Sequence, residues 1–168
     1  ISQNIIDLEE VEIRKIAKKN KIDIDKKTNK GKIIEKIFSQ LVEPNLIEPT
    51  FVIDYPVEIS PLARYKRNDS SKKYVERFEL FISGVEFANG FSELNDPNEQ
   101  KKRLINQNKL LKKGDGEAHM YDEDFIKVLE VGMPPTGGAG IGIDRVVMLF
   151  TQQKTIKDVI FFPSMRAE

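Results

Sequence analysis

Cysteine is absent from the 168 residues, which excludes disulfide bonds and thiolate metal sites and makes a reducing compartment the simplest expectation. A single histidine, His119, cannot build a histidine-rich metal site. The 27 basic and 27 acidic residues cancel, so the basic excess of a dedicated nucleic-acid binder is missing, and any RNA contact must be local or made elsewhere.

No apolar run approaches the ~18 residues of a membrane span, and no secretory or transit pattern opens the chain. Because the chain starts at Ile1 rather than at methionine, we expect it to be part of a longer one.

What the sequence does contain is an ordered series of helical and strand patterns. The predicted helices cover residues 7–20 (with Asp7 as N-cap), 31–43, 97–113, 122–132 and 143–150. The predicted strands cover residues 50–55, 75–82, 85–94, 137–142 and 158–162. The turn Ser83-Gly84 joins two of these strands as a β-hairpin. Hairpin-connected strands mixed with helices predict an α+β domain built on an antiparallel sheet.

The segment GGAGIGIDR, which ends at Arg145, is the most informative stretch. Gly138, Gly140 and Gly142 recur every second residue, so a strand here would have one face without side chains and the other packed into the core. A flat ring such as a nucleotide base can lie on such a bare face. We expect Asp144 to cap the following helix and Arg145 to clamp a phosphate or stack on a base. From spacing alone, a glycine strand packed on another element, with Arg145 in an ordinary ion pair, explains the pattern equally well.

The second strand of the predicted hairpin carries two carboxylates, Glu86 and Glu93, which could hold magnesium or an ammonium group. Seven residues apart, they would point to opposite faces of a regular strand. We therefore predict a bulge at Asn89-Gly90 that brings both to one site. The other interpretation is that one or both are solvated charges on an edge strand.

Taken together, these segments resemble the class II lysyl-tRNA synthetases. The matching stretches are TFVIDYPVEISPLA (50–63), ERFELFISGVEFANGFSELNDP (76–97), YDEDFIKVLEVGMPPTGG (121–138), GIGIDRVVML (140–149) and DVIFFPSMR (158–166). The resemblance implies a partial class II catalytic core, an antiparallel β-sheet flanked by helices. Residues 1–48 would be a helical insertion preceding the last sheet strands, and residues 49–168 the C-terminal part of the catalytic domain, including motif 3.

The resemblance also implies a reaction and its site. Lysine would attack the α-phosphate of ATP to give lysyl-adenylate, and the lysyl group would pass to tRNA(Lys), in a cytoplasmic homodimer that uses Mg²⁺. By position, Arg145 would hold the γ-phosphate, and Glu86 and Glu93 the metal. Arg145 and Glu93 are the expected catalytic residues. The lysine pocket would comprise Asn89, Phe91 and Glu93, so that Glu93 has two expected roles. The adenosine would lie on the glycines, which are Gly138, Gly140 and Gly142.

Several features depart from the family pattern. Val85 and Arg64 stand where the family often has arginine and lysine. Motif 1, motif 2 and the anticodon-binding barrel are not found, so we expect the isolated chain to be inactive. Two other functions remain as alternatives. One is a paralogue that lysylates a translation elongation factor, for which FHEL is expected in place of the FSEL that begins at Phe91. The other is a non-catalytic synthetase-like module. Glu86, Glu93 and Arg145 are all present, which argues against it, because a site without a function has no physical reason to keep like charges together at a cost in free energy.

Overall fold

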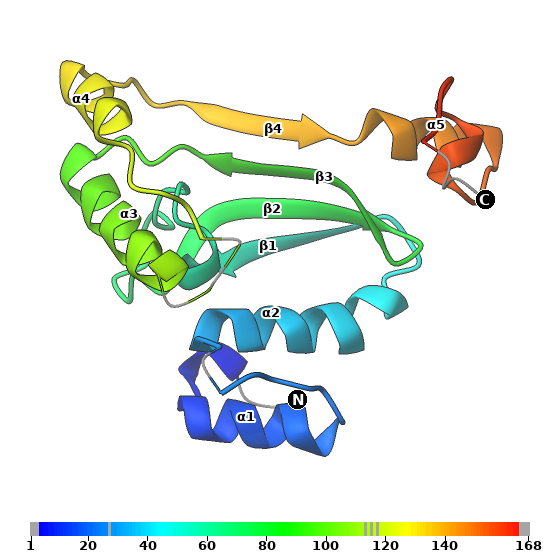
Figure 1. The fold of residues 1–168 in the computed structure, drawn as a ribbon, viewed down its shortest axis with the longest axis horizontal. Helices are drawn as coiled ribbons and strands as arrows, with labels where there is room; N and C mark the ends of the chain where they lie inside the picture. Colours follow the sequence, from blue (N-terminus) through cyan, green and yellow to red (C-terminus); the bar gives the residue numbers. More distant parts are fainter. Residues whose placement is uncertain (1–3, 27, 113, 115, 117, 165–168) are drawn as a thin grey trace.

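The computed structural model describes residues 4–26, 28–112, 114, 116 and 118–164. Its centre is a four-stranded antiparallel sheet in the order β1-β2-β3-β4, with helices along one side and at both ends (Figure 1). The strands are β1 (Thr50–Pro56), β2 (Tyr74–Ile82), β3 (Val85–Ser92) and β4 (Gly137–Ile141). The helices are α1 (Glu10–Lys19), α2 (Lys30–Leu41), α3 (Pro97–Lys112), α4 (Glu123–Val131) and α5 (Ile143–Thr151). The predicted α+β class on an antiparallel sheet is confirmed.

The β2–β3 hairpin forms where the sequence predicts it. Ser83 and Gly84 have φ angles of 53° and 74°, and two successive left-handed residues are what a tight hairpin turn requires. A side chain at Gly84 would also approach the backbone of Glu43 and Pro44 to 3.3 Å. The turn is therefore selected both by its dihedral angles and by the chain packed behind it.

Helices α1 and α2 form a small apolar core of their own beneath the sheet. Its buried members are Ile13, Ala17, Ile22, Ile33, Ile34 and Ile37. The predicted cap Asp7 is wrong, because α1 begins after Glu9, which forms a capping box with Glu12. Asp7 instead ends a short 3-10 turn, Ile5–Asp7, which is capped by Asn4. Two competing acidic caps lie within three residues, and the later one carries the reciprocal partner.

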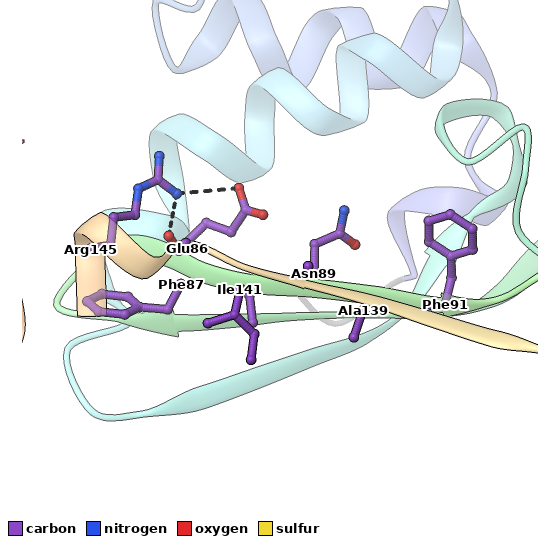
Figure 2. Close-up of a pocket in the computed structure, with 11 residues that line it drawn as sticks. Glu86, Phe87, Asn89, Phe91, Ala139, Ile141 and Arg145 are labelled. Carbon is purple, nitrogen blue, oxygen red and sulfur yellow. Dashed lines mark hydrogen bonds and ion pairs between the residues drawn. The ribbon is translucent and has the colours of Figure 1, made fainter. Parts of the chain in front are cut away.

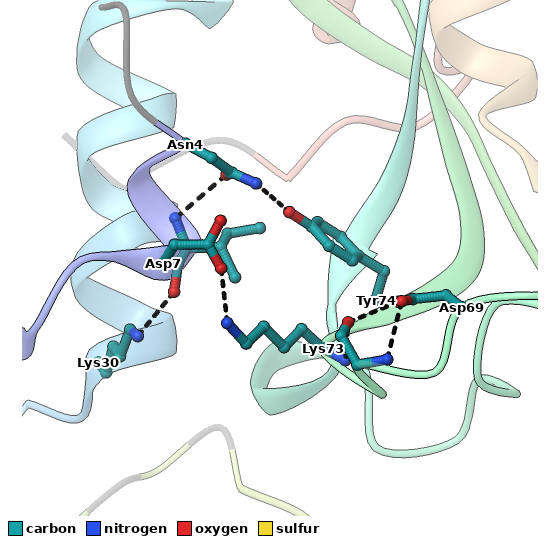
Figure 3. A network of polar contacts seen from close by, with 8 residues as sticks. Asn4, Asp7, Lys30, Asp69, Lys73 and Tyr74 are labelled. Carbon is teal, nitrogen blue, oxygen red and sulfur yellow. Dashed lines mark hydrogen bonds and ion pairs between the residues drawn. The ribbon is translucent and has the colours of Figure 1, made fainter.

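A polar network ties the start of the chain to the edge of β2 (Figure 3). Asp7 accepts a 2.6 Å hydrogen bond from Lys73, and Asn4 donates to the Tyr74 hydroxyl. The Lys30 ammonium donates to the Ile6 carbonyl oxygen over 2.7 Å. Because the Asp7 and Lys73 side chains are each about half exposed, solvent screening leaves this pair little effect on stability. The network orients the opening segment, whereas apolar packing supplies most of the attachment.

The predicted strand at 158–162 is wrong. Residues Ile156–Asp158 form a 3-10 turn, and Phe161 and Phe162 are 95% and 94% exposed. An isolated extended segment leaves its backbone hydrogen bonds unmade. Among the described residues, β4 pairs with β3 and no strand lies beyond it. The apolar composition of this segment therefore does not make a strand here. No helix in the described ranges combines the length and apolar character needed to cross a membrane.

Phe81 connects the helical layer to the sheet, and its removal should destabilise the chain strongly. Phe81 is 1% exposed and packs edge-to-face on Phe38 of α2. We expect Phe81→Ala to lower the free energy of unfolding by about 3–5 kcal/mol, since it deletes a buried ring. Phe51→Ala is the matched control, because Phe51 is 62% exposed and also makes an edge-to-face contact, with Phe78; we expect less than about 1.5 kcal/mol. Urea unfolding of both variants measures the difference, and equal losses would contradict this account of the interface.

Candidate active site

The candidate site is a hollow of about 530 Å³ over β3, β4 and the start of α5 (Figure 2). Its lining residues are Glu86, Phe87, Ala88, Asn89, Phe91, Gly138, Ala139, Gly140, Ile141, Gly142 and Arg145. These include seven of the eight residues that the sequence singled out. The eighth, Glu93, lies against the backbone of Gly138 at the other end of the same surface.

A bulge in β3 places the functional side chains on one face. Leu80 of β2 pairs with Ala88, but Phe81 pairs with Glu86, so Phe87 is an extra residue. As a result Glu86, three residues before Asn89, points to the same side as Asn89 and Phe91. A bulge is present in β3 as predicted, but it lies at Phe87, and its predicted position at Asn89-Gly90 is wrong.

Gly90 has a different role from the one predicted. A Cβ at this position would lie 2.7 Å from the Phe78 ring and 2.8 Å from the Gly138 carbonyl oxygen. The residue is glycine because the strands approach closely over an aromatic ring. A glycine in a strand is compatible with either a bulge or a close approach, so the sequence alone does not choose between them.

The glycines of β4 form the bare surface that their spacing predicts. Gly140 pairs with Asn89 and Gly138 with Phe91, and directly paired residues share a face of the sheet. A Cβ at Gly140 would meet nothing closer than the Asn89 carbonyl oxygen at 3.9 Å. The space above this strand is therefore open and borders polar groups of β3.

The opposite face of β4 is not packed into a core, contrary to the prediction. Ile141 is 61% exposed, and Phe51 and Ile53 on the same face of the sheet are each 62% exposed. Alternation predicts which side chains share a face, but burial needs a second layer to cover that face. In the part of the chain that the structure describes, no element covers these three side chains.

Arg145 lies in the first turn of α5, at one end of the hollow. Its Nη1 donates to the Glu86 carbonyl oxygen and is 3.8 Å from a Glu86 carboxylate oxygen. The two side chains are 45% and 42% exposed, so the guanidinium can still reach an anion in the hollow. The predicted capping by Asp144 is wrong: Gly142 is the N-cap, and Asp144 lies in the first turn. A carboxylate there still interacts favourably with the helix dipole.

Glu93 is held at the far end of β3. Its amide donates to the Thr136 carbonyl oxygen over 2.9 Å, and a Cβ at Gly138 would fall 2.7 Å from its Oε1. Burial raises the pKa of Glu93, because a desolvated carboxylate is less stable when charged. Such a carboxylate favours a cationic ligand, which would restore what desolvation costs.

The spacing along β3 bears on the expected roles of the two carboxylates. At about 3.3 Å per residue, the backbone positions of Glu86 and Glu93 lie roughly 20 Å apart along the strand. The Glu93 side chain reaches back to Gly138, which pairs with Phe91. Within the described ranges, no group of three or more histidine or acidic side chains is arranged to hold a metal ion. A solvent-facing carboxylate such as Glu86 fits Mg²⁺ that keeps few protein ligands and takes phosphate oxygens for the rest.

Sequence reasoning missed two residues beside the hollow, Arg77 and Glu79, which share its face of the sheet. Glu79 is 9% exposed and pairs across the sheet with Asn89. Its carboxylate accepts a 2.7 Å hydrogen bond from the Tyr55 hydroxyl and pairs with Arg77. Their signal is cross-strand pairing: once the turn and the bulge are placed, Glu79 falls opposite Asn89.

A glycine-lined strand beside an arginine in the first turn of the next helix, on an antiparallel sheet, is the arrangement expected of a class II synthetase core. The chain matches the family model for class II tRNA synthetases (D, K and N) over residues 3–166, and it belongs to this family.

Within that family, the chain is similar to curated lysine–tRNA ligases. The protein from Thermoanaerobacter pseudethanolicus is 57% identical over 151 residues, which cover 90% of this chain and 30% of the relative. The protein from Buchnera aphidicola subsp. Baizongia pistaciae is 54% identical over 166 residues (94% and 33%). The protein from Pelotomaculum thermopropionicum is 58% identical over 145 residues (86% and 28%). The chain thus spans about a third of the length of these relatives.

Proposed function

We propose that this chain supplies one side of the active site of a lysine–tRNA ligase. That enzyme would activate lysine with ATP to lysyl-adenylate and pyrophosphate, then transfer the lysyl group to tRNA(Lys). The observation that carries the proposal is a single surface with a bare glycine strand, an arginine at one end and a desolvated carboxylate at the other. These three features match a base, a phosphate chain and an ammonium group.

The residues divide along the surface by the charge that each would meet. Adenosine would lie on Gly138, Gly140 and Gly142, and Arg145 would hold the γ-phosphate. Glu86, next to Arg145, would hold Mg²⁺, which when bound neutralises phosphate charge. This work is positioning and electrostatic stabilisation rather than acid–base catalysis.

We assign lysine to the opposite end of β3. Asn89 and Phe91 would line its pocket, and Glu93 would pair with the side-chain ammonium. The burial of Glu93 supports the ammonium role, since a desolvated carboxylate favours a cationic partner.

The remaining assignments concern the whole protein. We propose that the gene's full-length product acts as a homodimer in the cytoplasm, with tRNA(Lys) as acceptor. We also propose that residues 1–48 are an insertion in the catalytic domain. The apolar attachment of α2 to the sheet through Phe38 and Phe81 supports treating them as part of that domain.

Gly140 tests the adenosine surface. We expect Gly140→Ala in the gene's full-length product to raise the KM for ATP about tenfold, because a methyl group would intrude on a ring held against the strand. Folding should be little affected, since the new Cβ meets protein atoms no closer than 3.9 Å. Gly137→Ala is the matched control: its Cβ would be equally free, with 3.8 Å to the nearest atom, but on the opposite face. Equal effects of the two variants on the KM would contradict the assignment.

The choice of acceptor separates the proposal from its alternatives. The full-length product should transfer radiolabelled lysine to tRNA(Lys) and leave a translation elongation factor unlabelled. Labelling of the protein instead would favour the factor-modifying paralogue. Failure to bind ATP at all would favour a non-catalytic module.

A further inference from the structure

Arg77 of β2 connects Asn89, which lines the hollow, to the loop that follows β1. Its Nη1 donates to the Ile59 carbonyl oxygen over 3.1 Å and to the Ser60 hydroxyl over 3.0 Å. Its Nη2 pairs with Glu79, and its Nε lies 3.3 Å from the Asn89 side-chain oxygen. All three guanidinium nitrogens are thus engaged on a side chain only 17% exposed.

The shape of the guanidinium makes this set of contacts possible. The planar group stacks on the Tyr55 ring, 4.7 Å from its centre. Tyr55 in turn donates to Glu79, the ion-pair partner of Arg77. Stacking fixes the plane of the group, and the fork of donors then fixes where its partners lie. An ammonium group could replace the charge but not this geometry.

The contact with Asn89 determines which end of that amide faces the hollow. A guanidinium has only donors, so the Asn89 atom that faces Arg77 has to be its oxygen. The amide NH₂ is then directed away from Arg77, on a side chain that lines the hollow. Arg77 itself does not line it.

We propose that Arg77 is a positioning residue for lysine binding: it acts through Asn89, holding the amide so that its NH₂ is presented to the substrate. The inference rests on the proposed function, because the substrate is the lysine assigned there. Arg77 touches no substrate atom. Its effect on lysine must therefore disappear when Asn89 has no amide to orient.

Arg103 provides a matched control. It is also a buried arginine, with an ion pair to Glu99 at 3.0 Å and a stack on Tyr65, 4.2 Å from the ring centre. It holds the same loop, since its Nη1 donates to the carbonyl oxygens of Ser60 and Ala63. These partners do not include Asn89. Loss of loop anchoring alone should therefore appear in both arginine variants.

The experiment is a double-mutant cycle on the gene's full-length product. Arg77→Lys keeps a cation for Glu79, so the protein should fold, but a lysine ammonium cannot also reach Asn89. We expect it to raise the KM for lysine about tenfold, the value of one hydrogen bond made by a charged group. The KM for ATP should change less than about threefold, which is smaller than the effect of one hydrogen bond made by a charged group. In the Asn89→Ala background, Arg77→Lys should have no further effect on lysine.

Each outcome decides the proposal. A similar rise with Arg103→Lys, or multiplying effects of Arg77→Lys and Asn89→Ala, would overturn it in favour of general loop support. If the wild-type product shows no lysine-dependent activity, the proposed function fails first. Crystal structures of wild type and Arg77→Lys then decide the positioning role: Asn89 should keep its orientation in the first and lose it in the second. An unchanged Asn89 would refute the role.

Discussion

Replacing Arg145 with alanine in the gene's full-length product should lower lysine-dependent ATP–pyrophosphate exchange by at least about 100-fold. The guanidinium stands at the end of the glycine surface and is held there by the Glu86 backbone. It is 45% exposed and lines the hollow, so it is both positioned and available. Removing a positioned cation leaves phosphate charge without a partner while the reaction proceeds.

Conservative and remote variants make the Arg145 result specific. Arg145→Lys should recover only part of the activity, because an ammonium cannot contact two phosphate oxygens with the planar fork of arginine. Arg67→Lys is the control, since Arg67 is 74% exposed and pairs with Glu76 away from the hollow. Activity near the wild-type level in Arg145→Ala would remove the phosphate role.

Glu93→Gln should raise the KM for lysine about 100-fold or more. Glutamine keeps the size of the side chain and loses its charge, so an ammonium group would be desolvated without its counter-charge. Truncating one partner of such a pair costs roughly 3 kcal/mol, which corresponds to this factor. The KM for ATP should change far less, because Glu93 lies at Gly138, at the end of the surface opposite Arg145. Steady-state kinetics with each substrate varied in turn would measure both.

Without ligand, Glu93→Gln should leave the stability of the folded protein unchanged or raise it, although it weakens lysine binding. Burial raises the pKa of Glu93 above its ordinary value, so the folded protein binds this proton more tightly than the unfolded chain. The stabilising contribution is present below the unfolded pKa and is lost as pH rises through the folded one. Glu93→Gln should therefore melt at least as high as wild type at neutral pH and lose less stability as the pH rises from acid to neutral. Glu130→Gln, on an exposed position of α4, is the control. A lower Tm for Glu93→Gln at neutral pH would contradict the desolvation argument.

Local signals predicted much of the fold. Ser83-Gly84 encodes a turn with two positive φ angles, and the glycines at every second position encode a strand with one bare face. Asp122 caps α4, accepting a hydrogen bond from the Phe125 amide. In each case a few neighbouring residues carry the information, so the sequence alone suffices.

The features that were predicted wrongly depend on distant partners. Whether β3 bulges at Phe87 or at Asn89-Gly90 depends on how Phe81 and Phe78 pack, which local sequence does not show. The strand expected at 158–162 would need a neighbouring strand. Glu79 and Arg77 carry no local signal, and only the pairing of β2 with β3 places them beside Asn89 and Phe91.

The most direct test of the central claim is ATP–pyrophosphate exchange with the gene's full-length product, measured with lysine and with each of the other amino acids. We predict exchange that depends on lysine and on Mg²⁺, and that is lost in Arg145→Ala. Exchange that is absent with lysine, or that is equally fast with another amino acid, would contradict the assignment of this surface to lysine activation.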